Sequence, residues 1–377
     1  ARTKEVNGAT YHMVGGHCLN SKNKEVMDFI FNEVLPKEDW HLVKRDAKIN
    51  FKGHFISYPI EFSIKEIAEF DEDLAFQMTS DFLSSEDVGE EASNLALWFE
   101  GKFGKTLARE YFIPYNKKIW GKAPSEMSHS WIEGKLPLPN KKEFFDALIG
   151  VREDTMPHST FYYPNSNTQN TFIEALGKGL VIVTDFTVET IENVKGKWLI
   201  NDSQEYDFVI NTMPLDRLPF VLRNVPIEIK NEAKKLKYNK ITNMLWKTKD
   251  IDFTWSYYPS EDTIFHRHIH IGNFFSKKQN YTITESMGER SYDEMEKAGR
   301  KFDYLEEPLD YNVSDYAYVV YDQNHAKATK SIKNYFKKAG LYSIGRFGEW
   351  EYYNMDICMQ RAFEICEKLR QQIETTT

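Results

Sequence analysis

The sequence contains little cysteine and no long apolar run. Cys18, Cys358 and Cys366 are the three cysteines among 377 residues, too few for a disulfide framework and typical of a reducing compartment. No apolar run approaches the roughly 18 residues that a membrane-spanning helix needs. The first residues, Ala1-Arg2-Thr3-Lys4, include two charged residues and are not typical of a signal peptide. We therefore expect a cytoplasmic protein without a membrane span.

Patterns typical of metal sites and of nucleic-acid binding are also missing. The ten histidines are scattered and no cysteine–histidine spacing is typical of a metal site, so no metal is predicted. His266, His268 and His270 alternate, which indicates one face of a strand, and such a face is more often hydrogen-bonded than metal-binding. The net charge of −9 argues against nucleic acid as a main partner.

The length and apolar content allow two or three packed units. Hydrophobic residues make up 41% of the chain and aromatic residues 15%, which is typical of a globular protein with a ring-lined site. Helical spacing predicts helices over residues 24–34 and 63–112. Alternation predicts strands over residues 41–62, 180–211 and 240–275. Because these elements follow no steady βαβ rhythm, the pattern favours interleaved α/β and α+β units.

The strongest local signal is a glycine-rich stretch before an amphipathic C-terminal helix. It runs from Gly345 to Asp356 and includes Arg346, Gly348 and Asn354. A helix N-terminus attracts anions because its first backbone N–H groups lack intrahelical partners and the helix dipole favours negative charge. Glycine permits close backbone approach, arginine adds a forked donor and asparagine is a good N-cap. The stretch indicates either a phosphate-binding turn or an ordinary turn before a docking helix, and the residues alone leave both open.

Four stretches resemble one flavoprotein superfamily and keep its order along nearly the whole chain. This superfamily includes UDP-galactopyranose mutase, protoporphyrinogen oxidase and the amine oxidases, and the chain looks most similar to the mutase branch. Any one stretch is a weak signal, whereas four in order indicate the superfamily. They are Gly15-Gly16-His17; Tyr58-Pro59-Ile60; Tyr115-Asn116-Lys117-Lys118-Ile119-Trp120-Gly121 with Pro124 and Leu136-Pro137; and Gly345-Arg346 with Tyr352, Met355 and Asp356.

The resemblance implies an α/β (α+β) fold in three parts, with FAD as cofactor and a small-molecule substrate such as a sugar nucleotide. A discontinuous, Rossmann-like FAD-binding domain would comprise residues 1–50, 177–240 and 330–377. Residues 51–176 would form a segment with the small helical domain and part of the substrate site. Residues 241–329 would form an antiparallel substrate sheet. The oligomeric state is not specified.

The chain departs from this family at its start. The family opens with a strand, a GxGxxG turn and a helix, whose glycines let the backbone approach the pyrophosphate. None of the nineteen glycines here belongs to a GxGxxG motif. Residues 1–17 resemble the family segment that comes after this first βαβ unit, and the sequence does not begin with Met. We therefore expect some tens of residues upstream, on which FAD binding would depend.

The resemblance also implies which residues bind the cofactor. Gly16 and His17 would lie beside the flavin, where an imidazole can adjust its protonation and redox balance. Val188 would approach the adenine, and Thr212 and Met213 would belong to the turn that closes that part of the site. The C-terminal residues implied in cofactor binding are Gly345, Arg346, Asn354, Met355 and Asp356, of which Asn354 stands where some mutases have Asp.

A second set of residues is implied in substrate binding and catalysis. Arg267 and Tyr352 match diphosphate-contacting residues and, with His17, would be catalytic. Tyr115 and Trp120 match the aromatic lining of the sugar and nucleotide site. Tyr162 stands where the mutases carry a second diphosphate arginine, and a phenol replaces neither the charge nor the fork of a guanidinium. A differently activated sugar or another small substrate is therefore open as an alternative to UDP-galactose.

Each of these residues also has an ordinary structural interpretation. Tyr115 and Trp120 could be core aromatics, Arg267 a surface strand residue, His17 a hydrogen-bonded loop residue and Tyr352 a packing residue. Three functions therefore stay open: a mutase-like FAD enzyme, an FAD oxidase of the amine oxidase or protoporphyrinogen oxidase type, and a truncated relative without catalysis.

Overall fold

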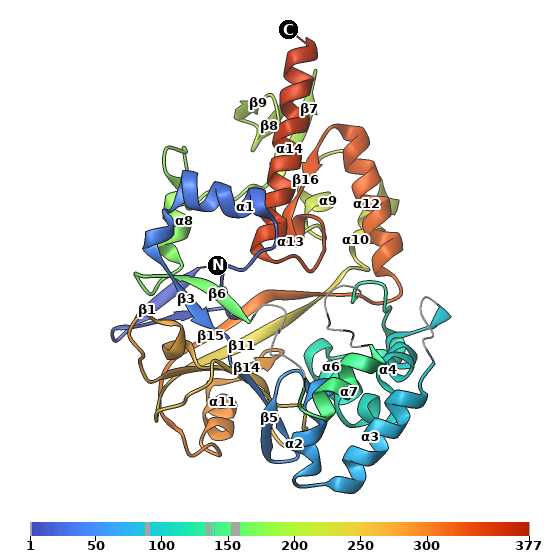
Figure 1. Cartoon of the computed structure of the whole chain (residues 1–377). Helices are drawn as coiled ribbons and strands as arrows, with labels where there is room; N and C mark the ends of the chain where they lie inside the picture. Colours follow the sequence, from blue (N-terminus) through green and yellow to red (C-terminus); the bar gives the residue numbers. More distant parts are fainter. Residues whose placement is uncertain are drawn as a thin grey trace. The chain divides into compact units, whose positions relative to one another are not determined.

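The computed structural model describes residues 2–86, 91–132, 136, 138, 140–151 and 159–376, along which helices and strands are mixed (Figure 1). Pro137, one of the residues that carry the resemblance, lies outside these ranges. The chain divides into two compact units of three segments each. The predicted mixture of α and β structure is confirmed, whereas the three-part domain division stays a prediction. The first unit comprises Ala1–Asn20, Pro36–Glu174 and Asn239–Ala317, and the second comprises Ser21–Leu35, Ala175–Tyr238 and Tyr318–Thr377.

A seven-stranded sheet forms the frame of the first unit. Its strand order is β15-β11-β14-β13-β12-β4-β5. β4 and β12 are parallel, whereas the pairs β4–β5, β12–β13, β13–β14 and β11–β14 are antiparallel. These strands confirm the alternation predicted over residues 240–275. The strands are β4 (Ala47–Phe51), β5 (His54–Ser57), β11 (Lys237–Thr248), β12 (Trp255–Tyr257), β13 (Phe265–Ile269), β14 (Tyr281–Met287) and β15 (Leu305–Val320).

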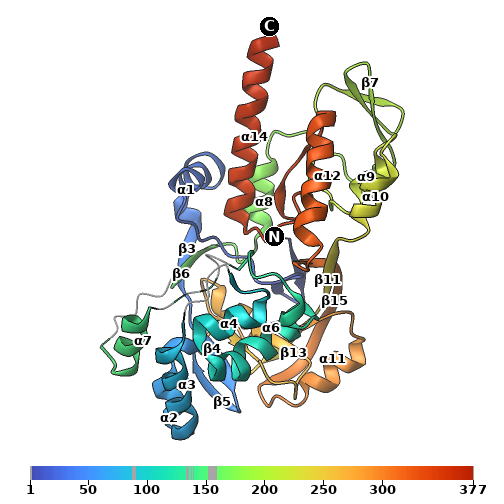
Figure 2. The ribbon, with the colours of Figure 1, turned by 90° about the vertical axis from the view of Figure 1, so that its right-hand side faces the viewer.

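The helices predicted over residues 63–112 are present and gather near β5 (Figure 2). Two of them begin at side-chain caps, because Asp71 accepts a hydrogen bond from the Leu74 N–H and Asn94 accepts one from the Leu97 N–H, both at 3.0 Å. The helical elements here are η3 (Ile60–Phe62), α2 (Ile64–Ala68), α3 (Glu72–Ser84), α4 (Leu95–Phe103), α5 (Lys105–Leu107), η5 (Ala108–Phe112), α6 (Ile113–Trp120), η6 (Pro124–Glu126) and α7 (Lys141–Leu148).

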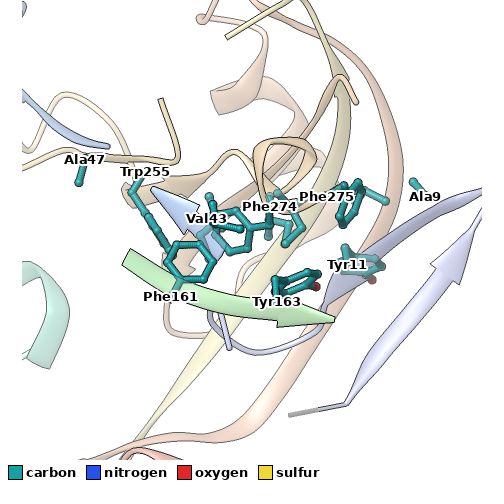
Figure 3. Packing of buried hydrophobic residues seen from close by; sticks show 13 residues of the cluster. Ala9, Tyr11, Val43, Ala47, Phe161, Tyr163, Trp255, Phe274 and Phe275 are labelled. Carbon is teal, nitrogen blue, oxygen red and sulfur yellow. The ribbon is translucent and has the colours of Figure 1, made fainter. Parts of the chain in front are cut away.

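An aromatic core joins two short strand pairs to the sheet (Figure 3). The rings of Phe161 and Tyr163 lie 5.0 and 5.7 Å from the ring of Phe274, and Trp255 of β12 lies 4.6 Å from it. This packing fixes the position of the loop after β2. The remaining elements are β1 (Thr3–Val6), β2 (Ala9–His12), η2 (Lys37–Asp39), β3 (Trp40–Lys44), β6 (Thr160–Pro164), α8 (Asn170–Gly177), η7 (Ile271–Phe274) and α11 (Tyr292–Gly299).

The second unit contains two small sheets and the C-terminal helices. β10 and β16 are parallel, with Ile210 opposite Tyr342 and Asn211 opposite Ser343, and β7, β8 and β9 are antiparallel. α10 packs against α12 (Figures 1 and 2). The elements are α1 (Lys24–Phe29), η1 (Ile30–Val34), β7 (Ile191–Val194), β8 (Lys197–Ile200), β9 (Gln204–Tyr206), β10 (Ile210–Asn211), α9 (Leu218–Val221), α10 (Ile227–Ala233), α12 (His325–Ala339), β16 (Tyr342–Ser343), α13 (Gly345–Gly348) and α14 (Met355–Thr376).

The prediction of strands over residues 180–211 is partly wrong. β7 to β10 lie in its second half, but residues 180–183 (Leu-Val-Ile-Val) belong to no strand and are between 65% and 96% exposed. A strand forms where a neighbour completes its hydrogen-bond ladder, and the described part of the chain pairs nothing with these residues. No helix of the described residues is long and apolar enough to cross a membrane.

Candidate functional site

Glu285 is a fully buried carboxylate on β14 of the first unit. One oxygen accepts two hydrogen bonds, one from the backbone N–H of Gly15 at 2.9 Å and one from the side-chain amide of Asn243 at 2.8 Å. The other oxygen pairs with the guanidinium of Arg267 on β13, and a ring nitrogen of His266 lies 3.8 Å from it. The carboxylate therefore ties the loop predicted beside the flavin to the arginine predicted to bind substrate.

Arg267 is the cation of this arrangement. Burial, followed by the charges of Arg267 and Lys118, lowers the pKa of His266 well below its ordinary value, so that imidazole is neutral. The side chain of Arg267 is 17% exposed, and its guanidinium is held by Glu285.

Four tyrosines form a series of ring contacts beside Arg267. Tyr257 is the cross-strand partner of Arg267, and its ring centre lies 6.0 Å from Tyr115 and 5.3 Å from Tyr58. Tyr111 stacks on Tyr115 at 5.5 Å. Burial raises the pKa of Tyr111 and Tyr115 well above 10. The phenols therefore keep their protons at neutral pH and can donate hydrogen bonds to a substrate.

The loop Gly15-Gly16-His17 is shaped by its glycines. Gly15 has φ +64°, where a side chain would be strained. A Cβ on Gly16 would lie 3.4 Å from the Trp255 ring, so this backbone packs directly on β12. The carbonyl of His17 accepts a hydrogen bond from Gln169, and its ring lies 5.4 Å from that of His12. The loop is thus fixed on both sides.

Trp120 does not lie with Tyr115. The two residues are five positions apart on α6, which places them about 140° apart around a helix. Trp120 is buried, donates from its indole nitrogen to Asn116 at 3.0 Å and meets the edge of Trp131 at 4.8 Å. These contacts are those of a core residue.

Tyr162 is also separate from the Arg267 cluster. It pairs with Leu42 in the β3–β6 ladder, and its neighbours Phe161 and Tyr163 point into the core, so the Tyr162 side chain faces the other way. The ammonium of Lys37 lies 6.0 Å from its ring. Tyr162 therefore does not take the place of the second diphosphate arginine that the mutases carry at this position.

In the second unit, the predicted nucleotide residues lie at one edge of a parallel strand pair. Thr212 and Met213 come directly after β10, and the Asn211 amide binds their turn through the Met213 carbonyl at 3.1 Å. Gly345 comes after β16, the parallel neighbour of β10. The carboxyl ends of parallel strands are where open α/β sheets bind ligands. Gly348 packs on this turn, because a Cβ there would lie 3.1 Å from the Asn211 carbonyl.

The prediction of a glycine-rich turn leading directly into the last helix needs correction. Gly345–Gly348 forms the short helix α13, and the connection to α14 is made by residues 349–354. Its Trp350 is buried with φ +59°. Helical geometry over residues 345–348 satisfies backbone groups locally, as the bond from the Glu349 N–H to the Gly345 carbonyl shows.

Arg346 and Tyr352 are brought together at this edge. The guanidinium of Arg346 lies 4.6 Å from the ring centre of Tyr352 and 5.1 Å from that of Tyr318, and it donates to the Tyr353 carbonyl at 3.3 Å. Tyr318 and Tyr352 stack at 5.6 Å. The planar guanidinium is thus held by aromatic rings.

The first turn of α14 carries the remaining predicted residues. Asp356 accepts a hydrogen bond from the Ser21 hydroxyl at 2.7 Å, while Asn354 is exposed and its carbonyl accepts from the Cys358 N–H at 3.1 Å. Met355 is half-buried. Val188 lies in the segment before β7.

Several residues around Glu285 and Arg267 were missed from the sequence, among them Glu285, Asn243, Tyr111 and Tyr257. Glu285 is the one charged residue of β14 (Tyr281–Met287), where its neighbours from Thr282 onward are all buried. A lone carboxylate in such a strand is a signal that could have been used, since buried charges need partners. Asn243 and Tyr257 carried no comparable signal.

Solved structures with this fold come from several flavin-linked groups. A reduced UDP-galactopyranose mutase has a TM-score of 0.79 and 18% identity, covering 93% of this chain and 82% of that chain. The chain has the fold of the FAD-dependent oxidoreductases. A protein assigned as a protoporphyrinogen oxidase, from Exiguobacterium sp. 255-15, has a TM-score of 0.73 and 14% identity, covering 98% of this chain and 90% of that chain. A redesigned putrescine oxidase has a TM-score of 0.59 and 12% identity, and the match also covers 98% of this chain and 90% of that chain.

The similarity to these solved structures confirms the predicted fold class, and it confirms the resemblance at the level of the fold. Identities of 12% to 18% establish nothing finer than the fold. No protein-family model matches the chain.

Proposed function

We propose that the protein is an FAD-dependent enzyme of the mutase-like type, acting on a sugar nucleotide or a related glycan precursor. The similarity to the reduced mutase over 93% of the chain supports the fold of such an enzyme. The observation that carries the proposal further is the shared carboxylate of Glu285, which binds both the Gly15 backbone and Arg267. It holds a substrate-binding cation at a fixed place beside the predicted flavin loop.

The residues present suit a flavin nucleotide. In the first unit, Gly16 presents backbone without a side chain, and His17 offers an imidazole nearby. In the second unit, Thr212, Met213, Gly345 and Arg346 lie at the carboxyl edge of β10 and β16, where open α/β sheets bind ligands. The first turn of α14, with Asn354, Met355 and Asp356, offers further N–H groups, and Val188 is assigned to the adenine.

FAD, when bound, supplies the electron pair that the chemistry needs. The chain's own residues bind and orient the substrate. In the first unit, Arg267 and the phenol of Tyr115 donate hydrogen bonds to it, and in the second unit Tyr352 is assigned to a phosphate. His17 holds or releases a proton next to the cofactor. Trp120 and Tyr162 fit this scheme less well, because their contacts lie elsewhere.

An oxidase is the second candidate. The protoporphyrinogen oxidase-like structure covers 98% of this chain and 90% of its own, which is as complete as the mutase similarity. Oxidase chemistry removes a hydride from a small substrate and passes electrons to oxygen, whereas mutase chemistry needs reduced flavin and leaves the substrate's oxidation state unchanged.

One assay separates the two. The purified protein, loaded with FAD and reduced with dithionite under nitrogen, is incubated with UDP-galactopyranose and other UDP- or TDP-sugars, and the nucleotide sugars are separated by chromatography. A new isomer formed only with reduced flavin supports the proposal. Oxygen uptake with hydrogen peroxide release, on putrescine or on protoporphyrinogen, would replace it with the oxidase.

A further inference from the structure

Arg45 is a cation of the first unit that the proposed function does not use. It comes directly after β3, and its guanidinium lies 5.3 Å from the ring centre of Tyr58 and 5.2 Å from that of Trp255. One terminal nitrogen donates to the Tyr257 hydroxyl at 3.0 Å. The Nε atom is buried and makes no hydrogen bond to any described residue.

No described carboxylate lies within ion-pair distance of Arg45. Its neighbour Asp46 pairs instead with Lys48 at 3.6 Å, and Glu285 is taken by Arg267. Cys18 is close, but burial raises the pKa of its thiol to about 12, so it stays neutral and provides no counter-charge. Tyr58, Trp255 and Tyr257 are the aromatic side chains in contact with Arg45.

A buried guanidinium without a counter-ion is costly, and aromatic rings offset only part of that cost. Arg267 shows the contrast within the same unit, since it has Glu285 as an ion-pair partner. Arg45 as a residue is of intermediate exposure, although its Nε atom is buried. The guanidinium and the hydroxyls of Tyr58 and Tyr257 suit the oxygens of a phosphate or carboxylate group.

We propose that Arg45, with Tyr58 and Tyr257, binds an oxyanion of a small-molecule ligand. Tyr257 connects this point to Arg267, because it bonds Arg45 and faces Arg267 across the β12–β13 ladder. The chain therefore supplies a second cation from the end of β3, although position 162 holds a tyrosine. The site stands on the first unit alone and does not depend on flavin binding.

The test is anion titration of the purified protein, with and without FAD. Inorganic pyrophosphate and malonate serve as separate probes, so that phosphate and carboxylate ligands are distinguished. Binding is followed by calorimetry and by tryptophan fluorescence, since the Trp255 ring lies against Arg45. We expect saturable binding of at least one probe, weakened about tenfold or more in Arg45→Met, which removes the charge and keeps much of the volume.

Arg109→Met is the matched control, because Arg109 is an exposed arginine of the same unit that pairs with Glu110. It should change the affinity less than about twofold, and Arg45→Lys should retain part of the binding. Far-ultraviolet circular dichroism and the urea midpoint establish that each variant is folded. If Arg45→Met does not fold, Arg45→Lys and the wild-type titration decide.

Wild-type protein that binds neither probe saturably would overturn the proposal. Arg45 variants that bind both probes as wild type does would overturn it as well.

Discussion

The backbone N–H of Gly15 donates a hydrogen bond to the carboxylate of Glu285 at 2.9 Å, across 270 positions of sequence. The same carboxylate pairs with Arg267 and is fully buried. A buried charge of this kind is kept only where its partners satisfy it. Glu285 therefore sets the distance between the glycine loop and the predicted substrate arginine.

Replacing Glu285 with Gln should be strongly destabilising. The variant keeps the shape but leaves Arg267 without its counter-charge, so we expect the free energy of unfolding to fall by about 3 kcal/mol. Urea unfolding followed by tryptophan fluorescence measures the change. The control is Glu289→Gln, whose carboxylate is exposed and pairs with Lys240, and it should cost less than about 0.5 kcal/mol. Equal, small losses would show that Glu285 is not the anchor.

His270 should make the free energy of unfolding depend on pH. Burial lowers its pKa to about 3, and it bonds Ser256 and Thr282 in the neutral form. Between pH 6.5 and 3 the unfolded state therefore binds a proton that the folded state excludes, and stability falls as the pH falls. Between about pH 7 and about pH 5, this group lowers the free energy of unfolding by about 2 kcal/mol.

Comparing variants isolates this contribution. In His270→Gln, the difference in unfolding free energy between about pH 7 and about pH 5 should shrink by that amount, whatever the absolute stability of the variant. His54→Gln changes an exposed histidine and should leave the pH dependence as in wild type. An unchanged pH dependence in His270→Gln would mean that folding does not lower the pKa of this imidazole.

Much of this architecture can be predicted from sequence patterns, and the exceptions have physical causes. The helices over residues 63–112 were predictable because their apolar spacing and caps act locally. Residues 180–183 were wrongly predicted because alternation reports a strand's faces and says nothing of whether a neighbour exists to pair with it. The prediction of a turn over Gly345–Gly348 failed for a similar reason, since glycine permits a turn without excluding a helix.

The candidate site was predictable only in part. Arg267 and Tyr115 were found through the resemblance, and the structure places both near Tyr257. Trp120 was placed in the site by the same resemblance, but its spacing on α6 turns it toward Asn116 and Trp131. Glu285 and Arg45 act through contacts between distant segments, and only Glu285, as the lone carboxylate of β14, leaves a local signal.

Arg346→Ala should weaken FAD retention. The guanidinium lies against the rings of Tyr318 and Tyr352 at the edge assigned to the nucleotide, so its loss removes a fixed cation from that edge. Apparent affinity for flavin, measured from the absorbance that remains after dialysis, should fall about tenfold. Arg370→Ala, an exposed arginine of α14, is the control and should retain flavin as wild type does. Equal retention in both variants would remove Arg346 from the cofactor site.

The central claim is that the protein is a flavoprotein, and its visible absorption spectrum tests this most directly. The protein, at the length its gene encodes, is purified, incubated with excess FAD, freed of unbound cofactor and scanned. The account predicts the bands of bound flavin, with one FAD released per chain on denaturation. A colourless protein after this incubation would contradict it and leave only the fold in common with the flavoenzymes.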